Sequence, residues 1–123
     1  MKKIVVVDDD EDMRHMIAHV LRERFEVEVA EDGEAGLALI RREKPDLVVL
    51  DLLMPRMHGF EVCRRVRSDS QLKHTKVLIS SSKSYTHDVK TAVEEAGADG
   101  YLIKPFRVAD LQKRVAELLG EPG

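Results

Sequence analysis

Five short runs of β-branched and other apolar residues alternate along the chain with stretches whose apolar residues recur at helical spacing. Each run has the length and composition of a buried strand, and each stretch between runs is typical of a helix with one buried face. Strand followed by helix, five times over, predicts a parallel sheet with helices on both faces. The runs cover residues 4–7, 27–30, 47–50, 77–79 and 101–103, and the helical spacing is found at 13–21, 33–40, 62–66, 89–96 and 108–118.

The second run differs from the others because Glu26 and Glu28 alternate with Val27 and Val29. Strands covered on both faces are apolar throughout, so an alternating strand belongs at the edge of the sheet. The strand order 2-1-3-4-5 places it there. We therefore predict an α/β fold of the flavodoxin-like (βα)5 kind, a doubly wound parallel sheet with that strand order.

Length and composition limit the class of protein. The chain has 123 residues, enough for one domain, which we expect at residues 1–120 with 121–123 as a tail or linker stub. Its 20 basic and 23 acidic residues give a net charge of −3, which argues against direct nucleic-acid binding by this domain. The single Cys63 excludes an internal disulfide. Without an apolar run of membrane-spanning length or a signal sequence, we expect a cytoplasmic protein with no membrane partner.

Acidic side chains follow the first and third predicted strands. Asp8 and Asp9 come after the first strand, and Asp51 follows the third. The carboxyl ends of parallel strands meet at one edge of the sheet, where ligands bind in such folds, so the three acids are expected to converge. Three carboxylates with carbonyl oxygens form a hard, oxygen-only site, which suits Mg²⁺. No His-x-x-His motif or cysteine pair lies near these acids, which disfavours zinc.

Hydroxyl groups and a cation follow the other two strands. The fourth strand leads into Ser80-Ser81-Ser82, and the fifth into Lys104-Pro105, whose peptide bond can be cis. With a metal neutralising the acids, Asp51 can act as a nucleophile while Lys104 and a serine hold the transferred phosphoryl oxygens. The sequence lacks both GxxxxGK[ST] and GxGxxG, so the phosphodonor is expected to be another protein or a small molecule rather than a nucleoside triphosphate.

These residues resemble the receiver domain of two-component response regulators, over about residues 3–119. The resemblance implies that Asp51 is phosphorylated from a phosphohistidine on a histidine kinase or a histidine phosphotransfer protein. It is carried by four motifs: Val7-Asp8-Asp9, Asp51-Leu52-Leu53-Met54-Pro55 with Gly59, Ser81 or a neighbour, and Lys104-Pro105-Phe106.

The resemblance also implies roles for individual residues. Mg²⁺ would be held by Asp8, Asp9, Asp51 and the backbone carbonyl of Leu53, and Lys104 would bridge Asp51 and the phosphoryl group. Such a domain is a signalling domain rather than an enzyme, with Mg²⁺-dependent self-phosphorylation from a phosphodonor and autodephosphorylation expected.

A switch pair is implied as well, and it maps onto Ser81 and Tyr101. Counting from the third strand favours Ser81, whereas counting back from Lys104 favours Ser82 unless the Ser84-Tyr85 region contains one extra residue. We assign the switch hydroxyl to Ser81. In the expected mechanism the phosphoryl group recruits this hydroxyl, Tyr101 moves inward, and the nearby surface changes its affinity for partners.

Two other functions compete with this interpretation. One is a receiver-like interaction module that works without phosphorylation, which the intact set of acids and lysine disfavours. The other is a metal-dependent phosphatase, which would need a second acid where Leu53 stands. The expected partner downstream is a protein target, or the chain's own output domain if this is a fragment, and phosphorylation-linked dimerisation is a further expectation.

Overall fold

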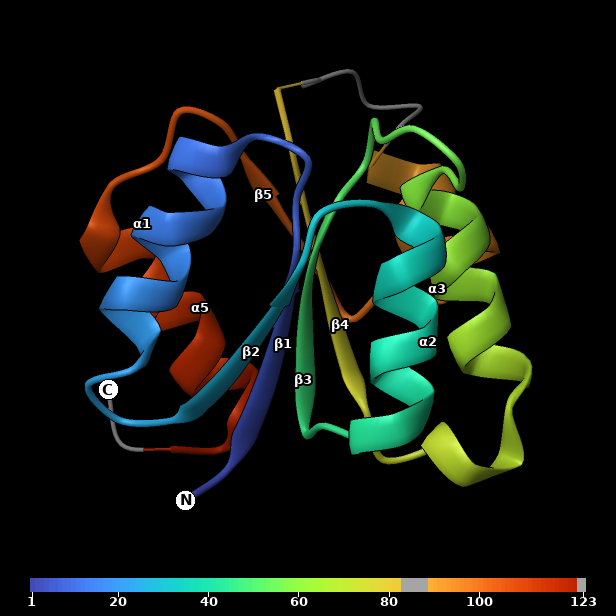
Figure 1. The fold of residues 1–123 in the computed structure, drawn as a ribbon, viewed down its shortest axis with the longest axis horizontal. Coiled ribbons are helices and arrows are strands. Elements are labelled where there is room, and N and C mark those ends of the chain that lie inside the picture. The colour runs from blue at the N-terminus through green and yellow to red at the C-terminus, as the bar shows by residue number, and fades with distance from the viewer. Residues whose placement is uncertain (83–88, 122–123) are drawn as a thin grey trace.

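The computed structural model describes residues 1–82 and 89–121, and it contains one five-stranded parallel sheet (Figure 1). The order is β2-β1-β3-β4-β5, so the predicted fold and strand order are confirmed. Residues 122–123 of the expected tail lie outside the described residues. The strands are β1 Lys3–Val7, β2 Glu26–Ala30, β3 Leu47–Asp51, β4 Lys76–Ser81 and β5 Gly100–Ile103. The helices are α1 Glu11–Leu21, α2 Gly33–Glu43, α3 Gly59–Ser68, the 3-10 helix η1 Ser70–Leu72, the π-helix η2 Thr91–Glu95 and α5 Val108–Leu119.

Helices cover both faces of the sheet, with α1 and α5 on one side and α2 and α3 on the other (Figure 1). Alternate side chains of one strand therefore enter two separate cores. On β1, Val5 and Val7 pack in the core under α2 and α3, whereas Ile4 and Val6 pack in the core under α1 and α5. Burial on both faces explains why β1 is apolar along nearly its whole length.

The edge position of β2 follows from its sequence. Val27 is buried, whereas Glu26 and Glu28 are exposed beside it. Charged side chains on an edge strand favour contact with solvent and oppose pairing with a strand of another chain. Cys63 lies in the core, where burial raises the pKa of its thiol to about 11. No helix in the described part of the chain is both long and apolar enough to cross a membrane.

One stretch departs from the expected α-helical pattern. The spacing of apolar residues over 89–96 predicts an α-helix, but the described residues from Thr91 to Glu95 form a π-turn. The amide of Ala96 donates to the carbonyl of Thr91 at 2.8 Å, five residues back instead of four. A π-turn holds one residue more than an α-helical turn, and apolar spacing alone does not distinguish the two.

Candidate functional site

Three carboxylates meet at the carboxyl ends of β1 and β3. Val7 lies directly across from Leu50, so the residues that follow them, Asp8 and Asp51, emerge side by side. Asp9 completes the group, and one carboxylate oxygen of each acid lies within 4.8 Å of the others. Asp8 and Asp51 are buried, whereas Asp9 is exposed and leaves the group open to solvent.

The backbone around Asp8 is fixed from three directions. Its amide donates to the carbonyl of Ala30 at 3.2 Å, and its carboxylate accepts from the amide of Asp10 at 2.9 Å. Arg14, one turn into α1, donates to the backbone carbonyl of Asp8 at 2.9 Å. Sequence reasoning missed this role of Arg14, because no local motif signals a contact that depends on how α1 folds back over β1.

Lys104, which follows the edge strand β5, brings a positive charge to the three carboxylates. Its Nζ lies 2.9 Å from Oδ2 of Asp8 and 3.4 Å from Oδ1 of Asp51. Burial lowers the pKa of the ammonium, but the hydrogen bond from Lys104 to Asp8 and the charges of Asp8 and Asp51 outweigh this, so the pKa is raised. The backbone amide of Lys104 donates to the carbonyl of Ser81, and the Lys104–Pro105 peptide bond is cis.

One ammonium does not fully compensate the buried acids. Desolvation, followed by the negative charge of Asp8, raises the pKa of Asp51 to about 7, although Lys104 opposes this shift. A divalent cation would supply the missing positive charge. The oxygen-only set of ligands, partly open at Asp9, fits a hard cation that keeps some of its waters.

The residues after β3 shape the rim of this group. Leu52 is buried, and its amide donates to the carbonyl of Ser80 at 3.2 Å. The next residue, Leu53, is 47% exposed. Gly59, the first residue of α3, packs directly against the backbone of Asp51 and Leu52.

We expect Gly59→Ala to destabilise the fold by about 2 kcal/mol, because the added Cβ would overlap the carbonyl oxygen of Asp51 and force β3 and α3 apart. Urea unfolding followed by circular dichroism measures the change. Gly100→Ala is the comparison for the added methyl group, because its Cβ would meet only side-chain atoms at 3.2 Å or more. A Gly59→Ala variant as stable as the wild type would contradict the close packing.

The three serines after the core of β4 occupy different environments. Ser80 and Ser81 are buried at the end of the strand, whereas Ser82 follows it and is exposed. Tyr101 on β5 is only 9% exposed and packs in the core under α2 and α3. The Ser84-Tyr85 region, where one extra residue would decide between Ser81 and Ser82, lies outside the described residues.

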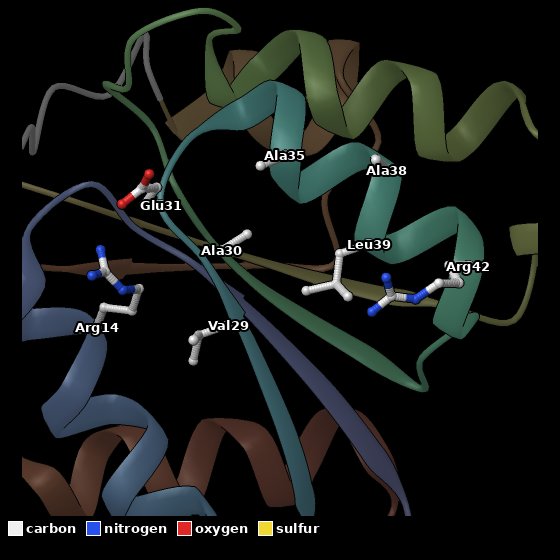
Figure 2. Close-up of a pocket in the computed structure, with 8 residues that line it drawn as sticks. All are labelled: Arg14, Val29, Ala30, Glu31, Ala35, Ala38, Leu39 and Arg42. Atoms are coloured by element: carbon white, nitrogen blue, oxygen red, sulfur yellow. The ribbon is translucent and has the colours of Figure 1, made fainter.

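A separate hollow of about 650 Å³ lies between α1, β2 and α2 (Figure 2). Figure 2 shows the guanidinium groups of Arg14 and Arg42 toward its opposite ends, with Val29 and Leu39 between them. None of the three clustered acids belongs to its lining as the described residues define it, so the hollow is distinct from the acid group. Its lining residues are Arg14, Val29, Ala30, Glu31, Ala35, Ala38, Leu39 and Arg42.

Comparison with known proteins identifies the class. The family described as the response regulator receiver domain matches residues 4–116, and the chain belongs to this family. The chain is 42% identical over 115 residues to the DNA-binding response regulator MtrA of Mycobacterium tuberculosis, covering 93% of this chain and 49% of MtrA. It is 36% identical to the response regulator ArlR of Staphylococcus saprophyticus, covering 97% of this chain and 53% of ArlR. The chain thus spans about half the length of these curated relatives.

Solved structures agree with this assignment. The chemotaxis response regulator CheY4 of Vibrio cholerae matches with a TM-score of 0.90 and 36% identity, over 97% of this chain and 99% of CheY4. The structure of a putative response regulator of Chloroflexus aurantiacus matches with a TM-score of 0.90 and 33% identity, over 98% of each chain. The chain is therefore a receiver domain of two-component response regulators, a signalling domain with a CheY-like flavodoxin fold.

Proposed function

We propose that this receiver domain accepts a phosphoryl group on Asp51 from the phosphohistidine of a histidine kinase or histidine phosphotransfer protein, in a Mg²⁺-dependent reaction in the cytoplasm. The observation that supports this most is the position of Asp51, within 4.8 Å of two further carboxylates and 3.4 Å from the Lys104 ammonium. Family membership favours this function over a phosphorylation-independent interaction module.

The residues suggest a simple course for the transfer. A carboxylate oxygen of Asp51 attacks phosphorus, the bond from phosphorus to the donor imidazole nitrogen breaks, and the imidazole leaves with the electron pair and takes up a proton. Lys104 holds a phosphoryl oxygen through the ammonium that now contacts Asp8 and Asp51. Asp8, Asp9, Asp51 and the Leu53 carbonyl would bind Mg²⁺, which supplies positive charge to the carboxylates and the phosphoryl oxygens. In autodephosphorylation, water attacks phosphorus, the bond from phosphorus to the Asp51 oxygen breaks, and inorganic phosphate leaves, which completes the proposed cycle.

The switch would lie at the ends of β4 and β5. Ser81 is the proposed hydroxyl that meets the new phosphoryl oxygens, because it is buried at the strand end whereas Ser82 is exposed. Tyr101 would respond from the neighbouring strand and alter the surface that a protein target, an output domain or a second copy contacts. MtrA is named as DNA-binding, and this chain matches about half of it. We propose that this domain itself, with a net charge of −3, does not contact nucleic acid directly.

Phosphorylation is tested by incubating the protein with Mg²⁺ and a small acyl phosphate and measuring its intact mass. We expect one added phosphoryl group with Mg²⁺ and none when a chelator removes it. Incorporation at an equal rate in the presence of the chelator would exclude the Mg²⁺-dependent reaction. The experiment is repeated with a phosphorylated histidine kinase as the donor. If neither donor gives any incorporation in the presence of Mg²⁺, the result would favour the phosphorylation-independent interaction module.

The affinity for Mg²⁺ should rise with pH. Asp51 must be ionised to bind the cation. Because its pKa is raised to about 7, about one molecule in ten has an ionised Asp51 at pH 6. We expect the dissociation constant for Mg²⁺ to be about tenfold higher at pH 6 than at pH 8. Isothermal titration calorimetry at both pH values measures this, with Asp51→Asn as the variant that lacks the titrating group. An affinity that is equal at both pH values would argue against the raised pKa.

A further inference from the structure

The hydroxyl of Ser80 lacks the partner that a buried polar group normally has. Ser80 is 1% exposed, and its Oγ is the one buried side-chain nitrogen or oxygen without a hydrogen bond in residues 1–82 and 89–121. A buried hydroxyl with no partner is unfavourable, and such groups in folded proteins mark strain, function or a missing ligand. An alanine would fill nearly the same space without this penalty.

The sheet register places this hydroxyl beside the acceptor. Ser80 lies directly across from Asp51 on β3 and from Leu102 on β5. Residues directly across in neighbouring strands project from the same face of the sheet. That face is the one under α1 and α5, because Leu102 packs in the core there. The Ser80 and Asp51 side chains therefore leave adjacent strands on the same face.

The side chain of Lys104 has to cross β4 to reach the acids. Lys104 follows β5, whereas Asp51 ends β3 and Asp8 follows β1, and β4 lies between β5 and β3. Lys104 comes two residues after Leu102, and strand side chains alternate with a period of two, so it starts on the same face as Ser80. The path of the lysine from β5 to Asp51 thus passes the end of β4 where Ser80 lies.

A cation in the site would change what the ammonium can bind. The Lys104 ammonium has three donors, and Asp8 and Asp51 accept from it in this structure. The same two carboxylates are proposed ligands of Mg²⁺, and a dication beside them repels the ammonium and competes for their oxygens. The ammonium then needs another acceptor close to its path, and Ser80 Oγ has a free one.

We propose that Ser80 is a positioning residue of the acceptor site, whose hydroxyl accepts a hydrogen bond from the Lys104 ammonium when a divalent cation occupies the carboxylates. This inference rests on the proposed function. Ser80 acts through Lys104: it keeps the ammonium beside Asp51 after the contact with Asp8 is lost. The hydroxyl without a partner in the metal-free protein gains its partner when the cation binds.

The test compares the dissociation constant for Mg²⁺ by isothermal titration calorimetry in the wild type, Ser80→Ala, Ser80→Thr and Ser80→Val. Threonine and valine have nearly the same shape and differ in the hydroxyl, so they form a matched pair. We expect alanine and valine to weaken Mg²⁺ binding by roughly tenfold, as for a lost hydrogen bond to a charged group, and threonine to restore it. In the Lys104→Met background, Ser80→Ala should leave the affinity for Mg²⁺ unchanged.

A purely structural role for Ser80 predicts a different pattern. The unpartnered hydroxyl would then only destabilise the fold, so Ser80→Ala would raise the melting temperature and leave Mg²⁺ affinity as in the wild type. That result, or an equal effect of Ser80→Ala with and without Lys104, would overturn the proposal. If the larger valine and threonine side chains prevent folding, the cycle of Ser80→Ala and Lys104→Met decides. A wild type that neither binds Mg²⁺ nor takes up phosphoryl would instead refute the proposed function itself.

Discussion

Asp51→Asn is expected to abolish phosphoryl incorporation while leaving the fold intact. An amide is no nucleophile toward phosphorus, and it has nearly the shape of the carboxyl group that it replaces. Intact-mass spectrometry after incubation with Mg²⁺ and an acyl phosphate gives the result directly. Glu117→Gln is the matched control because it makes the same change from acid to amide on the exposed surface of α5 and should be phosphorylated like the wild type. Incorporation that survives Asp51→Asn would place the acceptor elsewhere.

The same substitution should also stabilise the metal-free protein at alkaline pH. A carboxyl whose pKa is raised in the folded state binds its proton more tightly when folded, so its ionisation weakens the fold. For Asp51 the loss develops between its usual pKa of 3.8 and about 7, and is complete above that. Without Mg²⁺, we therefore expect the melting temperature of Asp51→Asn to be a few degrees above that of the wild type at pH 8. At pH 4 we expect the two melting temperatures to differ little. A difference that shrinks as pH rises would contradict this sign.

Lys104→Met is expected to slow phosphoryl incorporation by about 10²-fold, the usual effect of removing one preorganised electrostatic donor. Methionine keeps an unbranched apolar stem in the path across β4 but lacks the ammonium that contacts Asp8 and Asp51. The rate at saturating Mg²⁺ measures the effect. Lys73→Met removes an exposed lysine far from the acids in sequence and serves as the control.

Binding of Mg²⁺ should respond to Lys104→Met in the opposite direction. The ammonium competes with a metal for the oxygens of Asp8 and Asp51, so its removal should tighten Mg²⁺ binding even as transfer slows. Tighter Mg²⁺ binding together with slower transfer would indicate a specific role of Lys104 in transfer. A general disruption of the site would instead weaken Mg²⁺ binding and slow transfer. A variant with weaker Mg²⁺ binding and slower transfer would show that Lys104 mainly holds the site together.

Much of the fold was predictable because the relevant signals are local. On β2 the exposed Glu26 and Glu28 flank the buried Val27, as the alternation predicts for an edge strand, although Val29 is also exposed. The convergence of Asp8 and Asp51 was predictable because parallel strands end at the same edge, whatever the details of packing. These predictions depend on the alternation of side chains along a strand and on the order of the strands. Small shifts of the chain change neither.

Features that depend on a shift of one residue or on side-chain packing were not predictable. The π-turn at Thr91 differs from an α-helix by one residue in its hydrogen bonding, and both present apolar side chains at similar spacing. The contact of Arg14 with the Asp8 carbonyl depends on the angle at which α1 lies on the sheet. To predict that the Ser80 hydroxyl has no partner, one would need to know every neighbour of that oxygen atom. Each is a property of the assembled fold rather than of a segment.

The ion pair between Lys104 and Asp8 joins residues that are 96 positions apart in the chain. During synthesis Asp8, Asp9 and Asp51 leave the ribosome long before β5, and until then Lys104 is not there to contact them. This contact therefore forms only when the last strand has docked. Under the proposed function, we expect a truncated or proteolysed chain without β5 to accept a phosphoryl group from a kinase more slowly than the full chain.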